Sequence, residues 1–140
     1  MKSYVVDASV VAKCFIMEPH SDKALEVINA HVNGRLSLSA PSLIVYELGN
    51  IFWRHPNITS EKAYEFIEKF FDLQIDLLDI WSDAELLKKA CAISKTRKLT
   101  FYDSCYLAMV ERNGAKLVTA DEYLHNKAPN QVVLLKKFKE

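Results

Sequence analysis

The chain is poor in glycine and proline, and it has neither a long apolar run nor an excess of charge of one sign. Three Gly and four Pro among 140 residues leave little room for linkers. We therefore expect a single domain spanning residues 1–140, long enough to bury its own core. No stretch reaches the ~18 apolar residues that a membrane-spanning helix needs. No signal-peptide pattern opens the chain, so we expect a cytoplasmic protein with no membrane contact.

Charge and cysteine content exclude two further classes of protein. Eighteen basic and 18 acidic residues give a net charge of zero, which argues against a strongly basic protein that coats nucleic acid. An acidic site and a basic rim could still cancel in that sum. Cys14, Cys91 and Cys105 are widely separated and lie in apolar helical patterns, so we expect reduced, buried thiols. No spacing of Cys or His predicts a zinc site.

Apolar segments alternate with helical patterns along the whole chain. Strands are predicted at 3–6, 36–39, 75–80, 116–119 and 131–135, and helices at 9–16, 21–32, 41–54, 60–73, 82–97, 102–112 and from 121. Pro41 is expected at a first helical position, and the sequence SDAE at 82–85 is typical of a capping box. The alternation favours a three-layer α/β domain with a central parallel sheet. Such folds bind ligands beyond the carboxyl ends of their strands.

Four acidic residues stand where this fold could bring them together. Asp7 and Asp121 each follow a predicted strand, at the same edge of the sheet. Asp103 lies in the first turn of an apolar helix, and Glu47 lies on another. Each acid also has a structural alternative: an N-cap at Asp7, capping boxes at Thr100–Asp103 and Thr119–Glu122, or an ion pair between Glu47 and Arg54.

The combination of acids is harder to explain structurally than any one of them. Two ionised carboxylates ~5 Å apart repel each other by about 3 kcal/mol at an effective dielectric constant of ~20. This repulsion is large compared with a typical free energy of unfolding of about 5–15 kcal/mol. Four converging acids would therefore need a bound cation or shared protons. Oxygen ligands without His or Cys favour Mg²⁺ or Mn²⁺ over zinc.

Three segments resemble the motifs of a known family. They are VVDASVVAKCF at 5–15, APSLIVYELGNIFWR at 40–54 and LTFYDSCYLAMVERNGAKLVTADEYL at 99–124. In order and spacing they resemble the PIN-domain ribonucleases, most closely the VapC-type toxins of prokaryotic toxin–antitoxin pairs, over essentially the whole chain.

The resemblance implies a PIN-like α/β/α fold and a divalent-metal-dependent endoribonuclease that leaves 5′-phosphate and 3′-hydroxyl ends. It implies that Asp7, Glu47, Asp103 and Asp121 hold one or two Mg²⁺ or Mn²⁺ ions. A metal ion can lower the pKa of bound water and neutralise charge on the phosphorus centre and the leaving oxygen. The resemblance also implies an RNA substrate, a VapB-type antitoxin as partner and a homodimer.

Several neighbouring residues could support this chemistry. The hydroxyls of Ser9 and Thr119 could orient a carboxylate or a metal-bound water, or simply cap helices. Asn50 could meet substrate or metal-bound water, or make a structural hydrogen bond. Phosphates need cations, for which the candidates are Lys13, Arg54, Lys95, Arg97 and Lys98. The last three could instead favour a helix C-terminus.

Two other functions stay open. One is a non-catalytic PIN-like domain that binds RNA or protein. The other is an α/β phosphotransfer domain with Asp7 as nucleophile, although Ser9 stands where such phosphatases usually carry a second aspartate, and the paired acids of a receiver domain are absent. For Tyr64 and Phe71 we expect core packing rather than contact with a partner.

Overall fold

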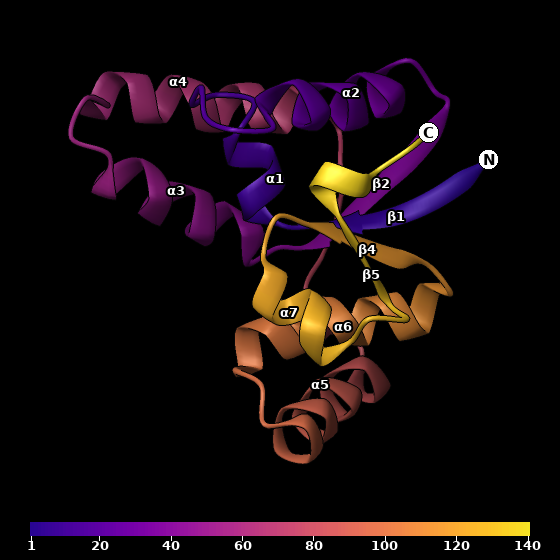
Figure 1. The fold of residues 1–140 in the computed structure, drawn as a ribbon. Helices are drawn as coiled ribbons and strands as arrows, with labels where there is room; N and C mark the ends of the chain where they lie inside the picture. Colours follow the sequence, from indigo (N-terminus) through magenta and orange to yellow (C-terminus); the bar gives the residue numbers. More distant parts are fainter.

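The computed structural model describes residues 1–140 and has a parallel five-stranded sheet in the order β3-β2-β1-β4-β5 (Figure 1). The strands are β1 (Lys2–Val6), β2 (Leu36–Pro41), β3 (Asp76–Leu78), β4 (Lys116–Thr119) and β5 (Val132–Leu134). The α-helices are α1 (Ala8–Ala12), α2 (Ser21–Val32), α3 (Ile44–Arg54), α4 (Ser60–Asp72), α5 (Ala84–Arg97), α6 (Phe101–Asn113) and α7 (Glu122–Lys127). Two 3₁₀ turns are η1 (Ile80–Ser82) and η2 (Leu135–Lys137).

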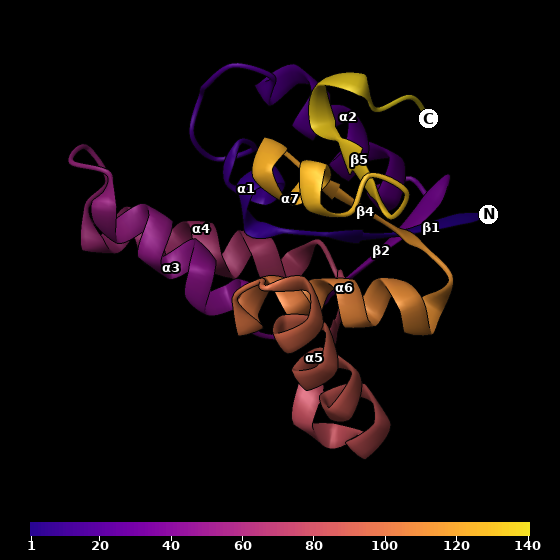
Figure 2. The ribbon, with the colours of Figure 1, turned by 60° about the horizontal axis from the view of Figure 1, so that its bottom comes forward.

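Helices cover both faces of the sheet. Helix α6 packs on β1, β2 and β4, and α5 packs on α6. Helices α1 and α2 lie on the opposite side, and α3 pairs with α4 in an arm that extends away from the sheet in both views (Figures 1 and 2). This arrangement confirms the predicted α/β/α domain with a central parallel sheet. None of the helices is both long and apolar enough to cross a lipid bilayer.

The central strands are apolar because both of their faces are covered. Val5 and Val6 of β1 and Leu117 and Val118 of β4 are fully buried. Strands buried on both faces form nearly continuous apolar runs rather than alternating patterns. The same burial makes the first polar residue after each strand stand out, and these residues lie at the carboxyl edge of the sheet.

The strand order places a topological switch point between β1 and β4. From β1 the chain proceeds to β2 and β3 on one side, whereas β4 and β5 lie on the other side. The connections therefore leave the neighbouring strands β1 and β4 in opposite directions. Open parallel sheets bind ligands at this kind of switch point, outside the carboxyl ends of the strands. Asp7 follows β1 and Asp121 follows β4 at this place.

Two local predictions are wrong. Pro41 is the last residue of β2 rather than the first of a helix, and α3 begins at Ile44. Pro41 is tolerated because it ends the strand, where the next ladder hydrogen bond is donated by the backbone of Ser42 to Leu78. The N-cap of α5 is Asp83, whose side chain accepts a hydrogen bond from the Glu85 amide, so the capping box from Ser82 does not form.

Burial corrects two further expectations. All three cysteines are free thiols, but Cys91 is exposed rather than buried, and Cys14 is only half-buried. Tyr64 and Phe71 on α4 are also exposed instead of packed in the core. Both errors arise because an apolar residue at helical spacing indicates a face of the helix, not whether that face is covered.

Candidate active site

Asp7 lies at the end of β1 and is the most buried of the four acids, with 9% of its surface exposed. Its Oδ1 accepts hydrogen bonds from the amides of Ser9 and Val10 and from the Ser9 hydroxyl, at 3.1, 3.4 and 2.6 Å. Its Oδ2 accepts a hydrogen bond from the Thr119 hydroxyl. Asp7 is therefore both the N-cap of α1 and a carboxylate in a fixed orientation.

The hydroxyls of Ser9 and Thr119 join the turns that follow β1 and β4. Each hydroxyl donates its proton to Asp7. Each also accepts a hydrogen bond from a backbone amide in the turn that follows β4. Ser9 Oγ accepts from the Ala120 amide at 3.0 Å, and Thr119 Oγ1 accepts from the Asp121 amide at 3.1 Å. The two hydroxyls thus orient the Asp7 carboxylate and fix the backbone that carries Asp121.

Glu47 reaches the site from α3 and is held by a residue that the sequence analysis missed. The buried Tyr106 of α6 donates its phenolic proton to Glu47 Oε1 at 2.5 Å. Burial and the nearby carboxylates raise the pKa of Tyr106 well above its usual value, so Tyr106 is a donor at every physiological pH. Tyr106 follows Asp103 by three residues, one helical turn, which is the signal that could have found it.

Asp103 and Asp121 complete the group at the first turns of α6 and α7. The amide of Asp103 donates to the Thr100 side chain, which caps α6 as expected. Asp121 is exposed and caps α7 through the Tyr123 amide at 3.0 Å. The Thr119–Glu122 box does not form; Glu122 instead pairs with Lys136 on the surface.

The charges of Asp7 and Asp103 act on Glu47, and the charge of Asp121 acts on Asp103. Burial raises the pKa of Asp7 from 3.8 to about 6, against the opposing effect of its hydrogen bonds. Burial also raises the pKa of Glu47 from 4.5 to about 7, with further contributions from the charges of Asp7 and Asp103, while the Tyr106 hydrogen bond opposes the rise. The pKa of Asp103 is raised by burial and then by Asp121. The structure therefore places each of the four acids that the sequence singled out within electrostatic reach of at least one other.

The four acids make no ion pairs, and their carboxyl groups are not arranged around a common point. None of the ten ion pairs in the molecule includes any of the four, and Glu47 does not pair with Arg54. No three His, Cys, Asp or Glu side chains stand where they would already hold a metal ion. In kind, the donors fit Mg²⁺ or Mn²⁺, because they are carboxylates and hydroxyls with negative charge in excess.

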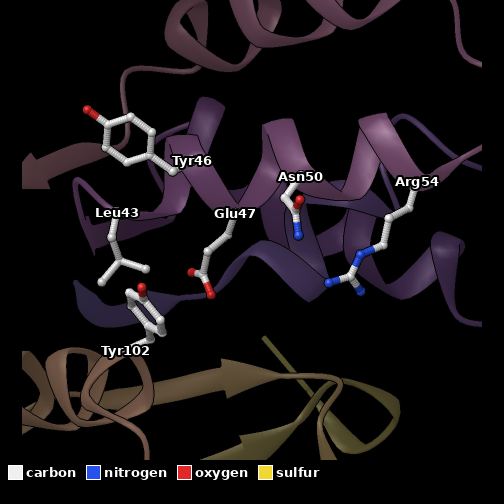
Figure 3. A pocket seen from close by; sticks show the side chains of 6 residues that line it. All are labelled: Leu43, Tyr46, Glu47, Asn50, Arg54 and Tyr102. Atoms are coloured by element: carbon white, nitrogen blue, oxygen red, sulfur yellow. The ribbon is translucent and has the colours of Figure 1, made fainter.

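A pocket of about 480 Å³ opens beside Glu47, between α3 and the first turn of α6. Figure 3 shows Glu47, Asn50 and Arg54 projecting in a row from one side of α3, with Tyr102 facing Glu47. Asn50 and Arg54 are both exposed. The polar stripe predicted on this helix therefore faces the pocket.

The other predicted phosphate ligands lie in different surroundings. Lys13 pairs with Glu18 at 3.6 Å, and only 14% of its side chain is exposed. Arg97 contacts Glu111 and Gln131. Because Gln131 precedes β5, Arg97 is directed to the amino edge of the sheet, away from the acids. The exposed Lys98 ends α5 in the left-handed conformation with φ 55° and makes no ion pair.

Comparison with known proteins agrees with this geometry. The PIN domain family matches residues 4–129. Ribonuclease VapC3 of Pyrobaculum aerophilum is 31% identical over 128 residues, which cover 89% of this chain and 94% of that protein. The crystal structure of PAE2754 from Pyrobaculum aerophilum has a TM-score of 0.69 and 27% identity, covering 96% of this chain and 85% of that one.

A more distant structural relative shares the fold alone. It is VapBC2 from Rickettsia felis bound to a DNA fragment from its promoter, with a TM-score of 0.72, 11% identity, and coverage of 94% of this chain and 98% of that one. The family match spans most of the chain, and the identity to Ribonuclease VapC3 extends over nearly all of it. This chain therefore belongs to the PIN-domain family and, within it, is most similar to the VapC-type ribonucleases.

Proposed function

We propose that this protein is a divalent-metal-dependent endoribonuclease that hydrolyses RNA phosphodiester bonds. The observation that carries the proposal is that four acids from distant segments lie within electrostatic reach of one another in pairs, without any basic partner. A structural role would call for ion pairs there, because an uncompensated buried charge is costly. The similarity to Ribonuclease VapC3 supports the same conclusion.

In this proposal Asp7, Glu47, Asp103 and Asp121 hold Mg²⁺ or Mn²⁺. Bound there, the cation would supply a water of lowered pKa and neutralise charge on the phosphodiester. Ser9 and Thr119 keep both Asp7 oxygens oriented. Tyr106 holds one Glu47 oxygen and leaves the other free to face the pocket. No separate general base is assigned.

Among the basic residues, Arg54 is the best candidate to bind the RNA backbone. It lines the same pocket as Glu47 and makes no ion pair. Lys98 is exposed and also unpaired. Lys13 and Arg97 are already engaged by acidic groups, so we give them a smaller part. Replacing one phosphate contact in a single strand lowers the slope of log K against log salt by about 0.7.

We further propose that the protein acts in the cytoplasm as the toxin of a VapBC-type pair, with residues 1–140 as one functional domain. The name of the Rickettsia felis complex describes such a pair bound to promoter DNA. A VapB-type antitoxin would then be the protein partner, and two copies of this chain would form a homodimer. The exposed Phe71 of α4 is available for contact with a partner.

A cleavage assay tests the enzymatic proposal. A pool of single-stranded RNAs is incubated with the purified protein in Mn²⁺, in Mg²⁺ and in EDTA, beside the Asp7→Asn variant. The proposal expects metal-dependent cleavage by the wild type, 5′-phosphate and 3′-hydroxyl ends, and little product from Asp7→Asn. Equal background cleavage by both proteins would overturn it.

One observation favours a second candidate, a non-catalytic PIN-like domain that binds RNA or protein. The carboxyl groups do not yet stand in a metal-holding arrangement. If the wild type binds RNA with the same affinity as Asp7→Asn and neither protein cleaves it in Mn²⁺, this second function replaces the first.

A further inference from the structure

The pocket beside Glu47 has features that holding a metal ion does not require. Its lining combines apolar side chains, an amide, a guanidinium and a carboxylate: Leu43, Tyr46, Glu47, Asn50, Arg54 and Tyr102. Figure 3 shows that Tyr46 projects away from the row formed by Glu47, Asn50 and Arg54, whereas Tyr102 faces it. The pocket therefore has one aromatic wall next to a polar wall.

The polar wall is unoccupied by protein partners. The other arginines, Arg35, Arg97 and Arg112, each pair with an acid. Arg54 has neither an ion pair nor a side-chain hydrogen bond, although Glu47 lies on the same face of its helix. Seven residues separate the two, which is about 10 Å along a helix, and no ion pair joins them although they line the same pocket.

The aromatic wall is Tyr102, which directly precedes Asp103. Its side chain lies in the first turn of α6 and is 64% exposed. An adjoining apolar pocket of about 170 Å³ shares Leu43 and Tyr102 with the first and continues toward Trp81 and Phe101. A large exposed apolar surface that continues into a polar pocket marks a binding site.

We propose that this pocket binds one unpaired nucleobase of the RNA, next to the phosphodiester that is cleaved. This inference rests on the proposed ribonuclease function. The base stacks on the Tyr102 ring, the Asn50 amide hydrogen-bonds to its edge, and Arg54 binds a neighbouring phosphate. An aromatic face, an amide and a cation are the groups that recognise unstacked nucleotides.

The same geometry requires that the bound base be unstacked and unpaired. A base inside a duplex has both faces covered by its neighbours and its pairing edge engaged, so it cannot lie against Tyr102 and meet Asn50 together. Loops, bulges and ends expose such bases. A peptide occupying this pocket would use the apolar wall and Arg54 but would not need a flat stacking partner.

A thermodynamic cycle between protein and RNA tests the proposal. The protein is the full chain, and the RNA is a short cleavable strand in which one position carries 2-aminopurine, whose fluorescence falls on stacking, or lacks its base. Binding is measured in Ca²⁺, with intact RNA checked on a gel. The protein variants are Tyr102→Ala, Tyr102→Phe and, as a matched control, Tyr64→Ala, because Tyr64 on α4 is 65% exposed. Thermal melts confirm that each variant is folded.

The proposal expects quenching by the wild type and a loss of affinity on the order of tenfold in Tyr102→Ala, as for loss of one base–aromatic stack. Tyr102→Phe keeps both signals, and Tyr64→Ala matches the wild type. Removing the base lowers the affinity of the wild type for RNA by the same factor and does not lower the affinity of Tyr102→Ala any further. Closing the strand into a hairpin stem weakens binding.

Two results would overturn the inference. One is additive effects: removing the base weakens binding to Tyr102→Ala as much as binding to the wild type, so the base does not contact Tyr102. The other is unchanged RNA binding in Tyr102→Ala together with loss of a bound apolar peptide, which would assign the pocket to a protein. Cleavage by the wild type in Mn²⁺ separates these failures from failure of the ribonuclease proposal, which would abolish cleavage altogether.

Discussion

The acids on the surface and the acids at the sheet edge have opposite surroundings and opposite pKa shifts. Glu65 on α4 lies between Lys62 and Lys69, and Glu122 pairs with Lys136; these cations lower the pKa of both carboxyls. Asp7 and Glu47 have no cation, and burial raises the pKa of both. The chain has enough lysine and arginine to pair acids elsewhere, so the unpaired edge is a feature of the site.

The difference supports the proposed cation site. In an exposed ion pair each charge is already neutralised by its partner, and the pair contributes little to stability. The acids at the sheet edge are supplied with hydrogen-bond donors that orient them, from Ser9, Thr119 and Tyr106, but not with positive charge. That combination fixes the oxygens and leaves their charge to be neutralised by something from solution.

The largest effect is expected from Asp7→Asn. The substitution preserves the shape of the side chain but removes the charge that every other group here supports. We expect RNA cleavage to fall by more than about 100-fold, because losing groups that merely support metal ligands already costs about 10–100-fold. Single-turnover cleavage in Mn²⁺ measures it. Retention of most of the activity would mean that Asp7 only caps α1.

The next effect is on the pH dependence of stability without metal. Because the pKa of Asp7 rises from 3.8 to about 6 on folding, the folded state holds a proton that the unfolded state has lost. The contribution of Asp7 to stability is therefore fully present below about pH 4 and is lost as the pH rises through 6, by about 3 kcal/mol at ~1.36 kcal/mol per unit.

Urea unfolding in EDTA from pH 4.5 to 7.5 measures this dependence. The free energy of unfolding of the wild type should decline over that range more steeply than that of Asp7→Asn. Parallel curves for the two proteins would show that Asp7 is not destabilised by ionisation. Saturating Mn²⁺ should restore stability at the upper end of the range, since a ligand that binds only the folded state stabilises it.

A smaller effect is expected from Tyr106→Phe. The ring is retained, but Glu47 loses the donor that opposes the rise in its pKa. We expect about a tenfold loss of cleavage, at the lower end of what orienting groups contribute, and a shift of the acid limb of the pH–rate profile to higher pH. A loss of activity without any shift in the profile would assign Tyr106 to packing alone.

The smallest effect is expected from Glu65→Gln, the matched control on the surface. Its carboxylate is exposed and its pKa is lowered only by Lys69 and Lys62. We expect unchanged RNA cleavage, unchanged Mn²⁺ binding and little change in thermal stability. A clear loss of cleavage in this variant would erase the distinction between the two groups of acids.

Sequence reasoning identified the fold and the positions of Asp7 and Asp121 because both depend on strong local signals. Continuous apolar strands alternating with helices indicate a parallel sheet, and an acid directly after a strand must lie at its edge. Asp7 and Asp121 follow from that rule alone. The meeting of Glu47 with Tyr106, 59 residues apart, depends on how α3 and α6 are placed by packing, which no local pattern encodes.

The errors have equally specific causes. Pro41 satisfies the helix-start preference and the requirements of a strand end equally well, and the backbone pairing of Ser42 with Leu78 decided for the strand. Ser82 and Asp83 are both good caps, and Asp83 prevailed because η1 engages Ser82 with Asp79. Tyr102 was overlooked because an exposed aromatic side chain gains meaning only from the pocket that it faces.

Calorimetric titration with Mn²⁺ at pH 6 and pH 7.5 tests most directly that the four acids form one cation site. The wild type should bind Mn²⁺ at both values, more tightly at pH 7.5, and release more protons at pH 6, where Asp7 and Glu47 are still partly protonated. Asp7→Asn and Glu47→Gln should each lose this binding, and Glu65→Gln should keep it. Equal affinity for Mn²⁺ in the wild type and Asp7→Asn, or no binding to the wild type, would contradict the account.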